Sequence, residues 1–77
     1  MKIFIFDYSK LKGKIREVCG TYSEFAHQLG CSLNTLSAKL NNKNEFTQSD
    51  IFKSIRILHI NLEDIPKYFF VLRVIKN

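Results

Sequence analysis

Short runs of β-branched and aromatic residues stand at both ends of the chain, and between them apolar residues recur at helical spacing. The segments 2–6 and 70–75 therefore predict two short strands. A two-stranded ribbon is marginally stable by itself, so it must pack on helices or on a second subunit. Two pairings stay open: one antiparallel ribbon joining the two ends of the chain, or strands that pair across a dimer.

A first helix is expected to begin after Asp7, whose side chain can cap it. Its inward face carries Leu11, Ile15 and Val18, and Gly20 can supply the left-handed conformation that ends it. The outward positions are basic. Such a face is most often simply solvated; its alternative role is contact with phosphate groups.

A second and a third helix follow with only a tight turn between them. Thr21 and Glu24 have the spacing of a capping box, Gly30 ends the second helix, and Ser32 caps the third. The inward side chains of the two helices are predicted to be Phe25, Ala26, Leu29, Leu36 and Leu40.

Two further helices complete the chain. Thr47 and Asp50 resemble a capping box with the shorter acid, and they open a fourth helix whose inward residues are Ile51, Ile55 and Leu58. Asn61 is expected to cap a last short helix. Pro66 must bend or restart that helix, because proline has no backbone N–H to donate.

The 77 residues fit one domain, 1–77, without a repeat or a linker. We expect a mainly α fold of five helices with a short terminal antiparallel ribbon. The net charge of +5 favours an anionic partner, either nucleic acid or a membrane surface. Two cysteines are too few to stabilise a small secreted domain through disulfides, and the apolar runs are too short to span a bilayer. No signal peptide is expected, so a cytoplasmic setting is the default.

The segment 21–42 has the spacing of a helix-turn-helix motif. Ala26 is small where the two helices cross, and Gly30 gives the turn its backbone freedom. With Leu36 and Leu40 inward, a small and mostly polar face is left pointing outward. This face consists of Asn34, Ser37, Ala38 and Asn41, with Leu33 at its edge. Such a face fits the DNA major groove, about 12 Å wide, although it is also compatible with an ordinary solvated helix side.

On these residues, together with the segments 6–15, 39–43 and 63–70, the chain resembles the phage Cro and cI-type family of helix-turn-helix repressors. It is most similar to the short Cro-like proteins of temperate phages of Gram-positive bacteria. The resemblance implies a lambda-repressor-like domain that regulates transcription by inserting its third helix into an operator. The operator would be an inverted repeat of double-stranded DNA, bound by a homodimer that forms in solution or only on DNA.

The resemblance also implies the residues that would contact DNA. Leu33, Asn34 and Ala38 would face base edges, with Asn34 pairing with adenine. The phosphate contacts would come from Tyr22, Ser23, Ser32, Ser37, Asn41 and Lys43. Two positions depart from the family: Tyr22 stands where such repressors often have Gln, and Leu33 replaces a commonly polar base-reading residue. Because Leu33 cannot hydrogen-bond to a base edge, direct readout is expected to be sparse and DNA shape to matter more.

A competing hypothesis uses the same fold as a protein-interaction module of the antirepressor or antitoxin type, without operator binding. Binding to structured RNA is a more distant option. The cluster 68–70 is either a partner surface or core packing. No catalytic motif, cofactor or small-molecule substrate is expected. A zinc site is not expected either, because its possible ligands have no finger spacing: Cys19, Cys31, His27 and His59.

Overall fold

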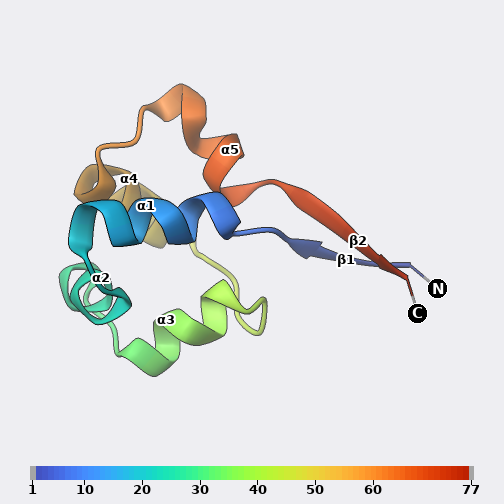
Figure 1. Cartoon of the computed structure of the whole chain (residues 1–77), viewed down its shortest axis with the longest axis horizontal. Helices are drawn as coiled ribbons and strands as arrows, with labels where there is room; N and C mark the ends of the chain where they lie inside the picture. Colours follow the sequence, from blue (N-terminus) through green and yellow to red (C-terminus); the bar gives the residue numbers. More distant parts are fainter. Residues whose placement is uncertain (1, 77) are drawn as a thin grey trace.

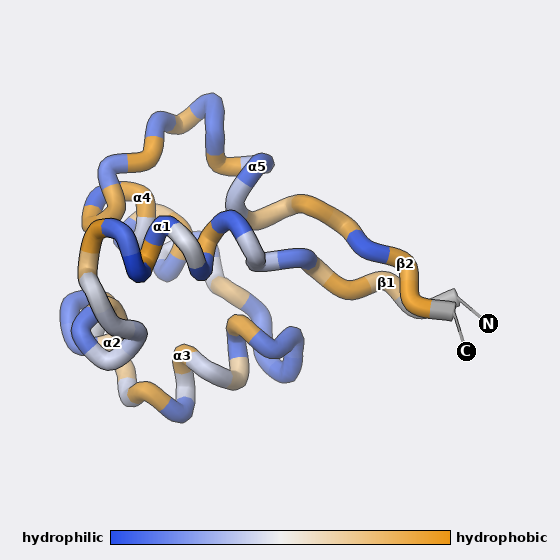
Figure 2. Tube along the Cα trace, viewed as in Figure 1, coloured by the Kyte–Doolittle hydropathy of each residue, from blue (hydrophilic) through white to orange (hydrophobic). Residues whose placement is uncertain are grey.

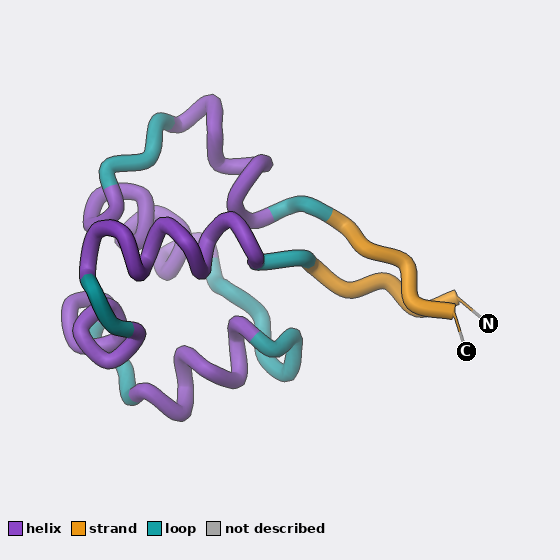
Figure 3. The backbone as a smooth tube through the Cα atoms, viewed as in Figure 1, coloured by secondary structure: helices purple, strands orange, loops and turns teal. Residues whose placement is uncertain are grey.

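The computed structural model of the chain describes residues 2–76. Within these residues five α-helices and one 3₁₀ helix lie between two terminal strands. Figures 1 and 3 show the helices gathered together and the two strands extending from them. The expected mainly helical domain with a terminal ribbon is confirmed. In chain order the elements are β1 (Lys2–Phe6), α1 (Ser9–Cys19), α2 (Tyr22–Leu29), α3 (Leu33–Leu40), α4 (Gln48–Leu58), η1 (Leu62–Asp64), α5 (Ile65–Phe69) and β2 (Leu72–Lys76).

One hydrophobic core lies between the helices. Leu11 and Ile15 of α1 are fully buried at its centre, where they meet Phe25, Leu36 and Leu58 from the next three helices. These positions recur every three or four residues along each helix, which is why each helix has one apolar face. Burying one such side chain contributes about 1.5–3 kcal/mol to stability. The core therefore fixes the helices relative to one another. It leaves outside the outward side of α3, here called the α3 face, which consists of Asn34, Ser37, Ala38 and Asn41 with Leu33 at its edge.

Side-chain caps start three of the helices as expected. The hydroxyls of Thr21, Ser32 and Thr47 each accept a hydrogen bond from the backbone N–H three residues further on. The capping box at Thr47 is complete, because the Asp50 carboxylate accepts from the Thr47 N–H at 2.9 Å. The box at Thr21 is only half formed, because the Glu24 carboxylate accepts from the Gln28 side chain instead.

Three details of the expected helix starts and strands are wrong. The N-cap of α1 is Tyr8 rather than Asp7, whose carboxylate accepts from the N–H and hydroxyl of Ser9 at 2.9 and 2.6 Å. Asn61 forms no side-chain cap, because a 3₁₀ turn precedes α5 and Pro66 lies in the first turn of the restarted helix. The second strand begins at Leu72, because Phe70 still closes the end of α5.

Val18 is not a core residue, contrary to the expectation for α1. Its side chain is 40% exposed, whereas Cys19 packs against the core at this end of the helix. Leu11, Ile15 and Cys19 follow one another at steps of four residues, and each step turns the inward direction by about 40° away from Val18. The sequence spacing is compatible with either Val18 or Cys19 facing inward, and the position of the next helix decides between them.

The two strands pair within the chain, which settles the question left open by the sequence. β1 and β2 are antiparallel, with Phe4 opposite Val74 and Phe6 opposite Leu72. The ribbon projects away from the helices and brings both ends of the chain to its tip, as Figure 1 shows. The radius of gyration is 12.4 Å. A compact chain of this length would have about 11.5 Å, so the ribbon makes the molecule elongated.

Candidate functional site

The α3 face lies on the outside of the molecule. Asn34, Ser37 and Asn41 are exposed, Leu33 is 45% exposed, and Ala38 is half-buried. The structure therefore brings the predicted base-contacting residues together on one side of α3. Their proposed contacts with bases and phosphates remain a prediction.

Two of the predicted phosphate-contacting hydroxyls already have partners within the protein. The Tyr22 hydroxyl accepts a hydrogen bond from Arg16 Nε at 3.3 Å, and the Arg16 guanidinium lies 4.8 Å from the centre of the Tyr22 ring. The Ser32 hydroxyl caps α3 through Thr35. Ser23 and Lys43 are exposed, and Lys43 is fixed by its backbone N–H, which donates to the Ala38 carbonyl at 2.8 Å.

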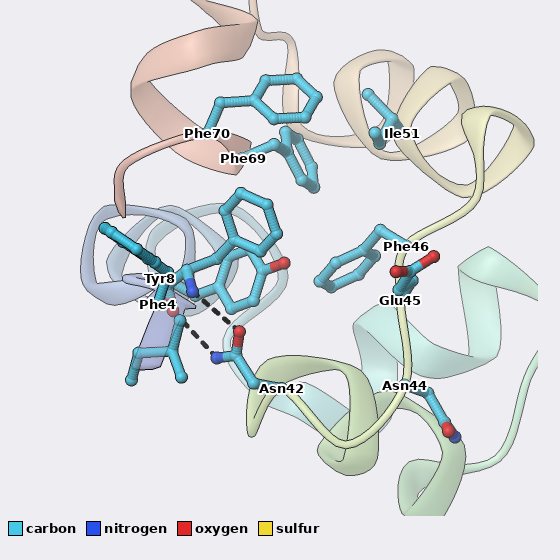
Figure 4. Close-up of a pocket in the computed structure, with 11 residues that line it drawn as sticks. Phe4, Tyr8, Asn42, Asn44, Glu45, Phe46, Ile51, Phe69 and Phe70 are labelled. Carbon is cyan, nitrogen blue, oxygen red and sulfur yellow. Dashed lines mark hydrogen bonds between the residues drawn. The ribbon is translucent and has the colours of Figure 1, made fainter. Parts of the chain in front are cut away.

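A groove of about 530 Å³ opens where the ribbon leaves the helices. Its walls come from β1, the α3–α4 loop and the end of α5. Figure 4 shows the rings that face it, with Phe46 at the centre of an edge-to-face series: its ring centroid lies 5.2 Å from that of Tyr8 and 5.4 Å from that of Phe69. We call this the aromatic groove; its aromatic lining is Phe4, Phe6, Tyr8, Phe46, Phe69 and Phe70.

Asn42 attaches β1 to the end of α3. Its side-chain oxygen accepts from the Phe6 N–H at 2.8 Å, and its side-chain nitrogen donates to the Phe6 carbonyl at 2.9 Å, the two dashed lines of Figure 4. The backbone of Asn42 has a φ of 62°, a left-handed conformation that asparagine adopts more readily than most residues. The amide thus occupies the outer edge of β1 as a neighbouring strand would.

Exposed apolar side chains are concentrated on the ribbon and on the two residues between α5 and β2. Phe4 is 60% exposed, Phe70 51%, Leu72 58% and Val74 44%. Figure 2 shows hydrophobic colour along both strands of this projecting part. Residues opposite each other in an antiparallel pair share a face, so Phe4, Phe6, Leu72 and Val74 form one face, here called the apolar ribbon face. Since Phe4 and Phe6 also line the aromatic groove, the two surfaces are continuous.

The other face of the ribbon carries positive charge at the end next to the helices. Arg73 stands opposite Ile5, and a small hollow there is lined by Arg73, Lys12 and Asp7. Hydrogen bonds from Ser9 lower the pKa of Asp7, and the positive charges of Arg73 and Lys12 lower it further. The ribbon therefore has one apolar face and a second face on which Ile5 and Ile75 are combined with the positive charge of Arg73.

A partly buried ion pair joins α3 to α4. Lys39 donates to the Asp50 carboxylate, and the side chains are only 14% and 17% exposed. Burial raises the pKa of Asp50, but the hydrogen bonds from Lys39 and Thr47 outweigh it and hold that pKa below its usual value. This contact fixes the α3–α4 loop, and with it one wall of the aromatic groove.

Within residues 2–76 no group of histidine, cysteine or acidic side chains is arranged to hold a metal ion. Cys19 and Cys31 are free thiols. In the same part of the chain, none of the helices combines the length and the apolar character that a membrane crossing needs.

Comparisons with known proteins place the chain among phage proteins. The model of the family described as "Protein of unknown function (DUF739)" matches residues 4–71. The chain is also similar to the modulator of repression of the temperate bacteriophage TP901-1 from Lactococcus lactis, known from a solution structure. The two are 49% identical with a TM-score of 0.75, over 84% of this chain and 88% of the other. A search of curated proteins found no match.

These findings correct the assignment to the Cro and cI-type repressors and, with it, the function of an operator-binding repressor. The similar protein is named as a modulator of repression, which agrees better with the competing hypothesis of a protein-interaction module. The physical reason for the error is that Ala26, Gly30 and Leu36 are required by the helix crossing and the turn. They specify the fold, and the fold does not specify what it binds.

Two features of this region were not predicted from the sequence. Asn42 was treated only as the last residue of the motif, although it fixes β1 in place. The apolar ribbon face was also missed, although the sequence contains one sign of it. Leu72 and Val74 lie on one face of β2, and Ile75 lies on the other. A strand with apolar residues on both faces needs a cover on both sides, and the helices cover little of this ribbon.

Proposed function

The chain belongs to the family described as "Protein of unknown function (DUF739)", and we propose that it modulates phage repression by binding a protein, the repressor itself. The single observation that carries this proposal is the 49% identity, over 84% of the chain, to a modulator of repression. The proposed setting is the cytoplasm of a bacterial host, and no catalytic step is part of the proposal.

The surface chemistry supports a protein partner. Exposed apolar side chains concentrated on one projecting element are typical of a protein-interaction surface. The apolar ribbon face and the aromatic groove have this character, and Phe4, Phe70 and Leu72 are each more than half exposed. Nucleic acid offers mainly phosphate and polar base edges to such a surface, so it would leave these side chains unmatched.

The proposal is tested with the repressor of the phage or prophage that encodes this chain. A reporter under the repressor's own promoter is measured while the chain is induced at several levels. We expect the chain to change the degree of repression in a dose-dependent way, and to have no effect on the promoter in cells that lack the repressor.

Purified proteins provide the second measurement. Isothermal titration of the chain into the repressor is expected to show a saturable complex. Titration of the chain alone with duplex DNA from the promoter region provides the comparison. A chain that binds that DNA sequence-specifically, changes the reporter without the repressor, and does not bind the repressor would overturn the proposal.

A further inference from the structure

We infer that the outer edge of β2 binds an extended segment of the partner protein, which adds to the ribbon as a third antiparallel or parallel strand. The segment would carry apolar side chains at alternate positions and an acidic side chain beside Arg73. This inference rests on the proposed function, because the partner is taken to be the repressor.

The hydrogen-bond pattern of the ribbon identifies the free edge. In an antiparallel pair, alternate residues direct their N–H and C=O groups toward the partner strand and away from it. The Asp7 N–H donates to the Val71 carbonyl at 2.7 Å, so this pair points inward. The next pair, Phe6 and Leu72, must therefore point outward, as must Phe4 and Val74.

The two outer edges differ where the ribbon leaves the helices, because only the β1 edge is occupied there. On β1, the outward N–H and C=O of Phe6 both bond to the Asn42 side chain. On β2, the outward groups belong to Leu72 and Val74, and within residues 2–76 the sheet ends at this strand. Buried backbone groups are almost always paired, and a bare strand edge is a ready template for another strand. Beside the aromatic groove, where Asn42 occupies the β1 edge, the β2 edge is therefore the site for strand addition.

The side chains beside this edge define the chemistry of the added strand. Leu72 and Val74 belong to the apolar ribbon face, so apolar residues of the added strand would extend that face toward the aromatic groove. Arg73 lies on the opposite face and is exposed. Opposite charges on neighbouring strands are favourable, so an acidic residue fits beside it.

The charge argues against a second copy of this chain as the occupant. Each copy has a net charge of +5, and β2 carries the exposed Arg73 next to the edge that would pair. Basic residues on a strand edge are a common protection against self-pairing, and like charges brought together across two strands are destabilising. An acidic segment of another protein meets no such repulsion.

Val74→Pro tests the backbone pairing, because it removes one outward N–H while the inward pairs of Ile5 and Arg73 remain. Affinity for the purified repressor is compared with that of Val74→Ala, which removes the side chain and keeps the N–H. We expect the proline variant to bind at least ~10-fold more weakly than the alanine variant. Phe4→Pro and Phe4→Ala are the matched pair on the β1 edge, and they should differ from each other by less than ~2-fold.

A proline in β2 can also disrupt the ribbon itself. Amide hydrogen exchange of the unmodified chain therefore tests the strand addition without the Val74→Pro variant. In the complex, the amides of Leu72 and Val74 should exchange at least ~10-fold more slowly than in the free chain. Arg73→Glu should also weaken binding by ~10-fold, whereas Lys53→Glu, the same charge change on exposed α4, should weaken it much less.

Each outcome separates this inference from the proposed function. If the chain binds the repressor but the amides of Leu72 and Val74 are not slowed, the strand addition is wrong and the proposed function stands. If the chain does not bind the repressor and leaves repression unchanged, the proposed function fails. If sedimentation of the chain alone shows a dimer that Val74→Pro abolishes, the occupant is a second copy and the inference is overturned.

Discussion

The side-chain amide of Asn42 pairs with both backbone groups of Phe6, at 2.8 and 2.9 Å, and so joins the end of the helix-turn-helix to the start of the ribbon. The two residues are 36 positions apart in the chain. This contact has two consequences. It orients the ribbon relative to the aromatic groove, and it occupies the β1 edge at Phe6, whereas within residues 2–76 no further strand pairs with the β2 edge.

Asn42→Gly should lower the free energy of unfolding by about 2 kcal/mol, since two hydrogen bonds are lost and each contributes about 1 kcal/mol. Asn42→Ala should cost about 1 kcal/mol more, because alanine is strained at a φ of 62° whereas glycine is not. Urea denaturation measures both values. Asn41→Ala, at the neighbouring exposed position, is the control and should change stability by less than about 0.5 kcal/mol.

Two glycines should respond to alanine with opposite signs. Gly30 has a φ of 89° in the turn between α2 and α3, although a Cβ there would meet no atom within 4 Å. Gly30→Ala should therefore destabilise the protein by about 1–2 kcal/mol through backbone strain alone. Gly13 lies inside α1 with the same open space, so Gly13→Ala should stabilise it by about 0.5–1 kcal/mol. Thermal denaturation followed by circular dichroism compares the two, and equal signs would contradict this explanation.

The ion pair between Lys39 and Asp50 should make stability depend on pH. The pKa of Asp50 is lower in the folded chain than its ordinary value of 3.8, so its contribution is present above that value. It is lost as the pH falls through the lower, folded-state pKa. Asp50→Asn should therefore cost about 1–3 kcal/mol at pH 7, and the difference from the unmodified chain should shrink below about pH 4.

Urea denaturation of both proteins between pH 2 and pH 7 measures this dependence. Asp64→Asn removes an exposed i, i+3 pair with Lys67 and serves as the control, with an expected cost below about 1 kcal/mol. A difference for Asp50→Asn that stays constant across the whole range would show that the carboxylate charge contributes nothing.

Phe46→Ala should destabilise the protein by about 3 kcal/mol, because the ring packs against Tyr8 and Phe69 and joins the α3–α4 loop to α5. Phe52→Ala is the control, because Phe52 is 55% exposed on α4 and should cost less than about 1 kcal/mol. Chemical denaturation gives both values. Similar costs for the two variants would mean that the aromatic series is not a structural unit.

Two exposed leucines test which surface acts in repression control. Leu72 on the ribbon and Leu33 on the α3 face are 58% and 45% exposed, so serine at either position should leave stability nearly unchanged. In the reporter measurement, Leu72→Ser should reduce the effect of the chain on repression by ~10-fold, and Leu33→Ser by less than ~2-fold. The reverse order would place the partner on the α3 face.

The sequence by itself determined which segments are helices and strands, because those depend on neighbours a few residues apart. The hydroxyls of Ser32 and Thr47 find their N–H donors three residues on, and the period of Leu36 and Leu40 gives α3 its inward side. From this local pattern the helical fold, the helix-turn-helix and the terminal strands were all predictable.

Only the tertiary structure decided what the chain offers to a partner. The pairing of the strands within one chain, the bond from Asn42 to Phe6 and the aromatic groove all join residues far apart in sequence. The exposure of Val18 likewise depends on the position of the neighbouring helix. Periodicity specifies one apolar side of an element but not what covers it, so a motif that specifies a fold was compatible with two different partners.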